Sequence, residues 1–526
     1  MAHTRFGLTV DGLATEYLAH AESLLAIGNG FLGMRGHPVS RIPSYQPAVF
    51  INGYYETHPI PYGEDAYGYA REAQTMLNLP DCRYLHLAFD GKVVDLNGDQ
   101  VSEHQRSLDF SNGVLRESFV YTSEAKQTFT VTFETALSQH ENHLGMVRLE
   151  VVGDTEAEIT ITSAIALPEH QKQEGLDPRV GSLDSRASLN VETVDLDEEA
   201  FSAAFITKRS GFALFCAAVH RMEGEYTATT TIDRDRMPTI SFTTIASSCV
   251  LEKTFSYRRD KEAPLSALVW KEFIAEQEEH YRAFWDASDV VIDGDAELQQ
   301  AIRFNLFQLH QSAGRDGRTS LAAKGLTGLG YEGQYFWDTE IYAMPLFSHT
   351  DPAIARSLIE YRISVLGAAR QRAQELHQRG ALFAWRTIGG AEVSAYYPAS
   401  TAQYHINADI AYAIFQYLEV SGDTTILAEG AFDLLIETAR LWVDLGFFDP
   451  RTDNAFVIHE VTGPDEYSAL VDNNYYTNLM ASYHLKQTAA IATWMAEYMS
   501  DAYQAAAERL GLKEGELVHF LAAAER

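Results

Sequence analysis

The stretch Phe129-Thr130-Val131-Thr132-Phe133-Glu134 decides the fold of the first half of the chain. Apolar and polar side chains alternate along it, which is typical of a β-strand with one buried face. The alternation returns at Glu158-Ile159-Thr160-Ile161-Thr162, and Gly, Asp and Asn turns separate such runs from about Arg83 to Leu251. Many short strands of this kind predict a large antiparallel β-sandwich, which we assign to residues 1–264.

Around Pro264 the apolar spacing changes from every second residue to that of a helix. Residues 265–287 predict a long amphipathic helix, so we expect 265–294 to form a helical linker between domains. Residues 295–526 are then a second, helical domain. The helices predicted in it cover residues 296–312, 337–347, 352–377, 402–420, 425–445 and 477–499, with two short ones from Asp501 to the end.

Composition restricts the class of protein. The chain has 526 residues, too many for one core, and 46% of them are apolar, enough to fill two. Lys and Arg number 40 against 73 Asp and Glu, which gives 40 − 73 = −33 and opposes binding to nucleic acid or anionic membranes. The three cysteines, Cys82, Cys216 and Cys249, are an odd number without metal-ligand spacing. These features, with no signal-like apolar segment, predict a cytoplasmic protein.

No cofactor is expected, because the sequence lacks a nucleotide-type glycine loop, a metal-ligand motif and a Ser-centred elbow. Gly28-Asn29-Gly30 is a turn former rather than a phosphate loop. Two clusters instead place carboxylates beside aromatic residues, Phe336-Trp337-Asp338-Thr339-Glu340 and Val461-Thr462-Gly463-Pro464-Asp465-Glu466-Tyr467. A Trp face stacks on a pyranose, and a carboxyl protonates a glycosidic oxygen. Carbohydrate chemistry is the function they indicate, although a core Trp and a helix-capping turn would use the same residues.

Several longer segments share one resemblance: residues 22–33, 51–57, 323–328, 336–342, 402–410, 461–467 and 472–474. Together they closely resemble glycoside hydrolase family 65, known mainly for inverting phosphorylases of α-linked glucose disaccharides such as maltose, trehalose, kojibiose and nigerose. The resemblance implies an (α/α)6 barrel after the β-sandwich. Such a barrel needs about twelve helices, and residues 295–526 supply about seven. We therefore expect the first part of a barrel, in a chain that is a fragment or an open ring and has little activity alone.

The resemblance also implies roles for individual residues. Glu466 would be the general acid, kept protonated by partial burial and by the neighbouring Asp465. Trp337 and Asp338 would hold the transferred glucose. Trp385, Arg386 and Glu392 would contact the second sugar, unless their loop merely packs on the barrel rim. The family commonly has Pro at the position of Ala384 and Glu at that of Ala391, so these departures leave the acceptor specificity open.

Three further candidates flank these motifs. Tyr404 and His405 precede an apolar helix face, and a histidine at a helix start should lose basicity, which suits a neutral partner for a sugar hydroxyl. A buried structural histidine is the alternative. Asn473 either orients Glu466 or satisfies backbone groups of its loop.

The resemblance favours phosphorolysis, with inorganic phosphate as co-substrate and β-glucose 1-phosphate and glucose as products. An inverting hydrolase would use a second carboxylate and a water instead of phosphate. An inverting α-glucoside hydrolase and a catalytically incomplete sugar-binding fragment therefore remain alternatives. The expected partners are a small α-glucoside disaccharide and phosphate, with no nucleic acid and no membrane. Family habit suggests a homodimer, and the sequence leaves the disaccharide open.

Overall fold

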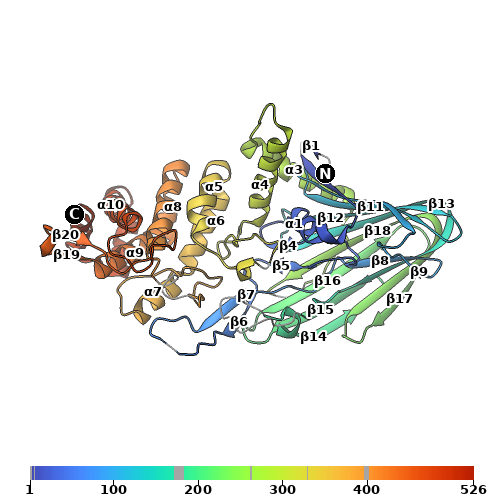
Figure 1. The fold of residues 1–526 in the computed structure, drawn as a ribbon, viewed down its shortest axis with the longest axis horizontal. Helices are drawn as coiled ribbons and strands as arrows, with labels where there is room; N and C mark the ends of the chain where they lie inside the picture. The colour runs from blue at the N-terminus through green and yellow to red at the C-terminus, as the bar shows by residue number, and fades with distance from the viewer. Residues whose placement is uncertain are drawn as a thin grey trace.

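The computed structural model describes residues 3–4, 6–64, 66–170, 183–260, 263–328, 330–395 and 402–526. A β-rich part and a helical part lie end to end along the long axis of the molecule (Figure 1). The predicted fold class, an antiparallel β-sandwich followed by a helical region, is confirmed. None of the helices in the described residues is long and apolar enough to span a membrane.

Hydrogen bonds join the strands of the sandwich into a 13-stranded antiparallel sheet within the described residues. Its main path runs β1-β2-β10-β11-β12-β13-β18-β16-β15-β14. The two longest strands, β13 and β18, have 21 residues each, and a bulge between Val152 and Ala157 interrupts their pairing. Because a bulge bends a strand, the part of β13 before it pairs with β12 and the part after it with β8. The strands are β1 (His3–Thr4), β2 (Gly7–Asp11), β8 (Leu85–Phe89), β9 (Lys92–Val93), β10 (Val101–Asp109), β11 (Val114–Thr122), β12 (Thr128–Leu137), β13 (Leu144–Ala164), β14 (Leu189–Leu196), β15 (Ala200–Thr207), β16 (Ala213–Met222), β17 (Thr227–Ile232) and β18 (Pro238–Arg258).

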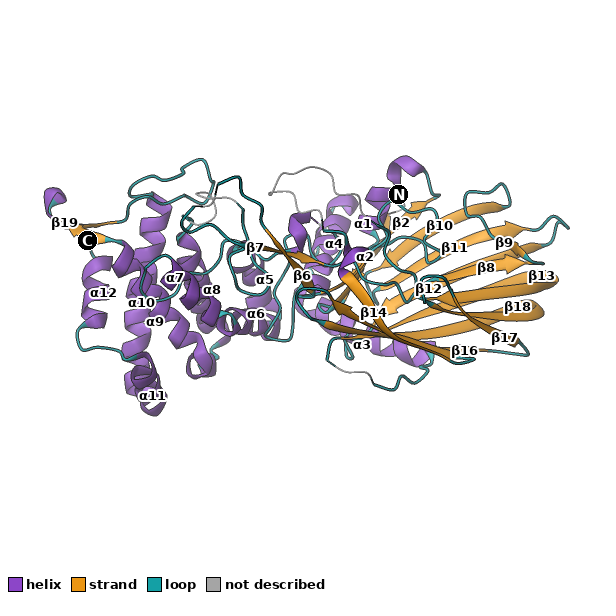
Figure 2. Ribbon diagram, turned by 90° about the horizontal axis from the view of Figure 1, so that it is seen from below, coloured by secondary structure: helices purple, strands orange, loops and turns teal. Residues whose placement is uncertain are grey.

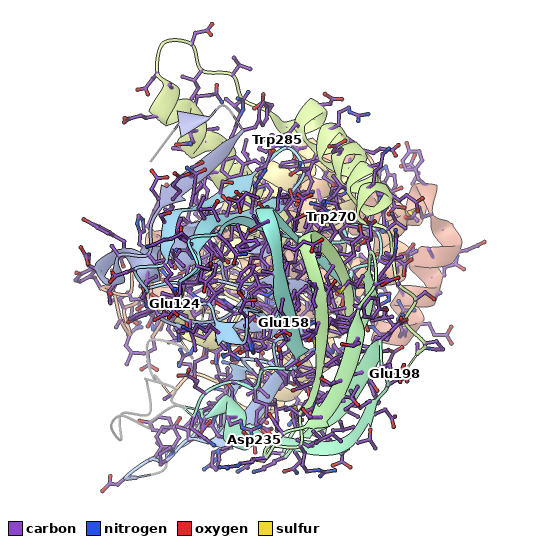
Figure 3. The ribbon with its side chains drawn as sticks, turned by 90° about the vertical axis from the view of Figure 1, so that its right-hand side faces the viewer. Glu124, Glu158, Glu198, Asp235, Trp270 and Trp285 are labelled. Atoms are coloured by element: carbon purple, nitrogen blue, oxygen red, sulfur yellow. The ribbon has the colours of Figure 1, made fainter. Side chains whose placement is uncertain are left out.

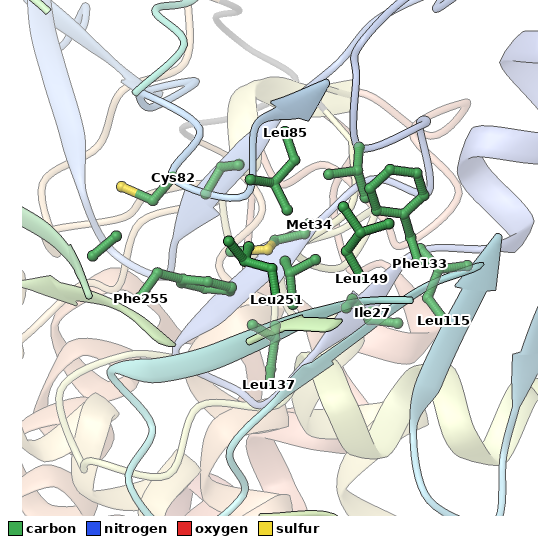
Figure 4. Packing of buried hydrophobic residues seen from close by; sticks show 14 of the residues in the cluster. Ile27, Met34, Cys82, Leu85, Leu115, Phe133, Leu137, Leu149, Leu251 and Phe255 are labelled. Carbon is green, nitrogen blue, oxygen red and sulfur yellow. The ribbon is translucent and has the colours of Figure 1, made fainter. Parts of the chain in front are cut away.

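Residues 129–134 lie in β12 as predicted, although the alternation of burial is incomplete because Thr132 is also buried. Phe129, Val131 and Phe133 are buried, and Thr130 between them is exposed. Figure 4 shows Phe133 packed in the sandwich core with side chains from neighbouring strands, among them Leu149. Full burial of one such side chain stabilises the fold by about 1.5–3 kcal/mol, so this core is the main source of stability for the sandwich.

Short strands form the junction between the two parts. They are β3 (Ile27–Gly28), β4 (Leu32–Met34), β5 (Val49–Ile51), β6 (Tyr55–Pro59) and β7 (Glu72–Met76), with helices α1 (Leu18–Leu24) and α2 (Ser185–Ser188) nearby in the β-rich part. The amide of Gly28 donates to the side-chain Oε1 of Gln311 at 2.6 Å. The amide of Gly30 donates to the backbone oxygen of Gln311 at 2.7 Å. The Gly28–Gly30 turn therefore binds the helical part directly.

The linker helix is α3 (Trp270–Ser288), which begins later than the predicted residue 265. The cause is a bond to the sheet, because the amide of Leu268 donates to Oγ1 of Thr254 at 3.0 Å and holds the preceding segment extended. Figure 3 shows α3 along the sandwich with Trp270 and Trp285 at either end, while Glu124 and Asp235 lie on the outer surface. The indole nitrogen of Trp285 donates to the backbone oxygen of Phe110 at 2.8 Å, which anchors the end of α3 on the sheet.

The helical part places its longer helices side by side (Figure 2). Helix α4 has the predicted bounds, whereas the helix predicted over residues 352–377 is two helices that meet at Val365. The hydroxyl of Ser364 donates to the backbone oxygen of Tyr361 at 2.7 Å, a local bond that competes with helix continuation. The elements are α4 (Ala296–Ser312), a π-helical turn (Thr339–Ala343), α5 (Met344–Thr350), α6 (Pro352–Ser364), α7 (Leu366–Glu375), α8 (His405–Ser421), a second π-helical turn (Leu427–Ala431), α9 (Phe432–Leu445), β19 (Phe447–Asp449), β20 (Ala455–Val457), α10 (Tyr475–Tyr498), α11 (Ser500–Leu510) and α12 (Glu516–Ala524).

Candidate active site

The acid motif lies on a loop closed by paired bridge bonds between Val461 and Val471. Glu466 has φ +62° on this loop, a left-handed conformation that is costly for a residue with a side chain and is concentrated at functional sites. Its side chain is exposed, so the partial burial expected for a protonated carboxyl is not found.

Gln403 connects the acid motif to the beginning of α8. Its Nε2 donates to Oε1 of Glu466 at 3.2 Å, and the amide of Thr462 donates to the backbone oxygen of Ala402 at 2.9 Å. Both contacts come from the segment just before His405, the first residue of α8. Sequence reasoning did not single out Gln403, although it lies within one of the family-like segments.

Trp337 and Asp338 lie just before the π-helical turn. Trp337 is half-buried and Asp338 is exposed, so one face of this pair remains accessible. The Trp337 ring packs edge-to-face on the ring of His405, with centroids 4.9 Å apart. A half-buried indole beside an exposed carboxylate can stack on a sugar ring and bind its hydroxyls.

His405 is fully buried, with an exposed side-chain fraction of 0%. Its Nδ1 lies 2.7 Å from Oδ2 of Asp409, one turn later on α8. A sugar hydroxyl cannot reach His405 unless its neighbours move, so the structure favours the alternative of a buried structural histidine. The helix predicted over residues 402–420 begins at His405, and Tyr404 is its N-cap residue. That tyrosine is nearly buried, and its hydroxyl accepts from Nε2 of Gln378 at 3.3 Å.

A buried ion pair lies beneath the Trp337 segment. Glu340 accepts from Nε and Nη2 of Arg362 at 2.6 and 2.9 Å, and both side chains are 2% exposed. The predicted helix over residues 337–347 becomes a π-helical turn followed by α5 here, and such turns are frequent at functional sites. The pair ties the turn to α6.

The second loop carries Trp385, Arg386 and Glu392. Trp385 is half-buried and packs edge-to-face on Phe336, the neighbour of Trp337, with ring centroids 5.5 Å apart. Arg386 is buried, with its guanidinium 5.7 Å from the centre of the Trp385 ring. The Glu392 carboxylate accepts from the amides of Trp385 and Ser394 at 2.7 and 2.9 Å. Burial raises the pKa of Glu392, and these amide bonds oppose that shift, so Glu392 shapes the loop.

Asn473 does not bond to Glu466 in the described residues. Its Oδ1 accepts from the amide of Ile458 at 3.0 Å, and its own amide donates to the Ile458 oxygen at 2.7 Å. The structure therefore agrees with the second predicted role, in which Asn473 satisfies backbone groups of its loop. The remaining candidates form one connected set, from Trp385 through Phe336 and Trp337 to His405, and from there through Gln403 to Glu466.

Comparison with known proteins places this arrangement in a family. Residues 8–288 match the description "Glycosyl hydrolase family 65, N-terminal domain", and residues 303–523 match "Glycosyl hydrolase family 65 central catalytic domain". The chain belongs to glycoside hydrolase family 65. The two matched regions correspond to the β-sandwich with α3 and to the helices that carry the site.

Family 65 relatives align along nearly the whole chain. An α,α-trehalose phosphorylase from Thermoanaerobacter brockii is 40% identical over 96% of this chain and 68% of its own length. An α,α-trehalose phosphorylase from Geobacillus stearothermophilus is 34% identical over 99% of this chain and 70% of its own. A solved structure described as a candidate kojibiose phosphorylase from the human microbiome superposes with a TM-score of 0.88. It is 20% identical and covers 100% of this chain and 70% of its own, which establishes the shared fold.

Proposed function

We propose that this family 65 chain carries out inverting phosphorolysis of an α-linked glucose disaccharide, and that α,α-trehalose is its first candidate substrate. Two trehalose phosphorylases at 40% and 34% identity support the choice of reaction and substrate. The observation that carries the proposal is the contact between Gln403 and Glu466. This contact joins Glu466, the proposed acid, to the segment just before His405, whose ring packs on Trp337.

In the proposed mechanism, Trp337 stacks on the transferred glucose and Asp338 binds its hydroxyls. The Glu466 carboxyl donates its proton to the glycosidic oxygen as the bond to the anomeric carbon breaks. Inorganic phosphate attacks that carbon from the opposite face, which inverts an α-linkage to β-glucose 1-phosphate and releases glucose. Phosphate is already nucleophilic, so the reaction needs neither a second carboxylate as base nor a metal. Because the chain carries a net charge of −33, local donors must bind the phosphate.

Trp385 and Arg386 are proposed to contact the departing sugar, because Trp385 packs on Phe336 beside the glucose platform. Glu392 and Asn473 act by holding the loops that carry Trp385 and Glu466. Tyr404 acts in the same way at the start of α8. The His405 ring packs on Trp337 and holds it in position.

The deciding experiment incubates the chain with trehalose, maltose, kojibiose and nigerose, with and without phosphate, and follows products by NMR. We expect β-glucose 1-phosphate, formed only with phosphate and fastest from trehalose, at the low rate that a partial barrel predicts. Glucose released at equal rates without phosphate would identify a hydrolase. Sugar binding with no cleavage in either condition would identify a sugar-binding protein, and either outcome would overturn the proposed reaction.

A further inference from the structure

We propose that a hydrogen-bonded chain of Tyr476, Asp409 and His405 positions Trp337 and sets the affinity for the transferred glucose. Asp409 and His405 are buried, and Tyr476 is half-buried. The inference rests on the proposed function, in which Trp337 stacks on that sugar. Asp409 and Tyr476 are then positioning residues, which act through His405 and Trp337 and touch no substrate.

The hydrogen bonds of Asp409 define the chain. Its Oδ2 lies 2.7 Å from Nδ1 of His405, and its Oδ1 accepts from the hydroxyl of Tyr476 at 2.8 Å. Because a carboxylate can only accept, the His405 nitrogen must donate, which places the ring proton on Nδ1. Burial raises the pKa of Asp409, and the two bonds oppose that shift. Both oxygens are therefore committed to orienting their partners.

Asp409 is the group that fixes the His405 ring. The other ring nitrogen, Nε2, is buried and has no hydrogen-bond partner in the described residues. Rotation of the ring is therefore limited by the Asp409 bond and by packing alone. Without that bond, the ring could turn against its aromatic neighbours.

The ring contacts transmit this orientation to Trp337. The His405 ring meets Trp337 at 79° with centroids 4.9 Å apart, and it meets Tyr476 at 79° and 5.4 Å. Trp337 and Tyr476 also lie 6.4 Å apart, so the three rings form one cluster. No hydrogen bond from the Trp337 indole is present in the described residues, which leaves packing to orient it. Edge-to-face contacts are directional, so a turned His405 ring would displace the Trp337 ring.

Three separate segments meet in this cluster. His405 and Asp409 lie one turn apart on α8, Tyr476 is in the first turn of α10, and Trp337 precedes the π-helical turn. The orientation of Trp337 thus depends on how α8 and α10 pack, at a place that neither helix forms alone. This explains a buried carboxylate here, which would otherwise be costly to keep in the fold.

The test uses Tyr476→Phe, which removes the hydroxyl and keeps the ring, and Asp409→Asn, which keeps the size and removes the charge. Tyr412→Phe is the matched control, because Tyr412 lies on α8 and packs on Tyr483 at 5.8 Å, outside the chain. Binding of methyl α-D-glucoside is measured by tryptophan fluorescence, and Trp337→Phe identifies the signal of Trp337. Thermal midpoints and the Michaelis constants of the disaccharides are measured alongside.

We expect Tyr476→Phe to weaken glucoside binding by about 2–10-fold, the effect of one hydrogen bond, and Asp409→Asn by about 10-fold or more. KM should rise by the same factor for every disaccharide with kcat little changed, because the glucose subsite is common to all. Tyr412→Phe should match the wild type. Unchanged binding in a folded Tyr476→Phe protein, or losses that differ between disaccharides, would overturn the inference.

Binding separates this inference from the proposed reaction. If glucoside binds and responds to Tyr476→Phe but nothing is cleaved, the proposed reaction fails and the positioning chain stands. If phosphorolysis proceeds and Tyr476→Phe binds normally, the chain fails and the reaction stands. If Trp337→Ala binds glucoside as well as the wild type, the platform itself is wrong, and the inference falls with it.

Discussion

Glu466 combines an exposed carboxyl with a strained backbone, at φ +62° on the acid loop. Replacing it with Gln should leave the fold and sugar binding intact, because Gln has the same size. It should reduce kcat by about 10²–10⁴-fold, since an amide cannot donate the proton. Initial rates of glucose 1-phosphate release measure this, with Glu419→Gln, at an exposed position on α8, as the control expected within a few-fold of wild type. Near-normal turnover by Glu466→Gln would remove its role as the acid.

The two site tryptophans should respond differently to the identity of the substrate. Trp337→Ala should raise KM for all α-glucosides alike, because in the proposed mechanism Trp337 stacks on the sugar that they share. Trp385→Ala should change the order of preference among disaccharides, because Trp385 is proposed to contact the sugar in which they differ. The values of kcat/KM for the four disaccharides give the comparison. Equal losses for both variants on every substrate would contradict two subsites.

Between elements, the buried pair of Glu340 and Arg362 links the π-helical turn to α6. Arg362→Met should destabilise the protein by about 3–5 kcal/mol, because it leaves a buried carboxylate without its partner. Arg221→Gln removes a half-exposed guanidinium that pairs with Glu252 at 3.4 Å, and should cost about 1 kcal/mol or less. Urea unfolding measures both. Equal small effects would show that the pair does not hold the turn in place.

Across the whole molecule, the junction depends on close backbone contact at Gly30. A Cβ there would lie 2.3 Å from the backbone oxygen of Ala313, and Gly30 has φ +82°. Gly211 is the matched control, with φ +68° and no atom within 4 Å of an added Cβ. Both Ala variants carry the left-handed strain, so Gly30→Ala should be less stable than Gly211→Ala by about 1–3 kcal/mol, the cost of the clash. Thermal unfolding gives the comparison, and equal losses would contradict the tight junction.

Buried histidines should make the whole fold sensitive to acid. Burial lowers the pKa of His220 in the sandwich and of His484 in the helical part to about 3. Below the unfolded value of about 6.5, the unfolded chain binds protons that the folded chain does not. Each histidine should therefore remove about 1.4 kcal/mol of stability per pH unit as the pH falls from about 6.5 toward 3.

Urea unfolding at pH 7, 6 and 5 tests this pH dependence. His484→Gln should reduce the slope of stability against pH by about one proton, whereas His20→Gln, at an exposed position, should leave it unchanged. A stability that stays constant between pH 7 and 5 would contradict the buried neutral histidines.

The sequence by itself determined features that depend on neighbouring residues. Alternation in residues 129–134 was enough for the strand β12, because side chains i and i+2 share one face whatever packs on it. Spacing likewise predicted the bounds of α4, and the family-like segments identified the family. The roles of Glu466 and Trp337 stay predictions. These patterns involve residues close together in the chain, so the sequence alone is enough to identify them.

Tertiary structure alone decided which side chains are buried and what they touch. Glu466 is exposed and His405 is enclosed, although both stand in family-like segments of the sequence. Asp409 lies one turn from His405, a spacing that could have suggested their contact, but Tyr476 comes from another helix and gave no signal. The close approach of Gly390 to Val365 is also tertiary, since a Cβ on Gly390 would lie 2.7 Å from that of Val365. Burial and contact belong to surfaces brought together by folding, which no local pattern records.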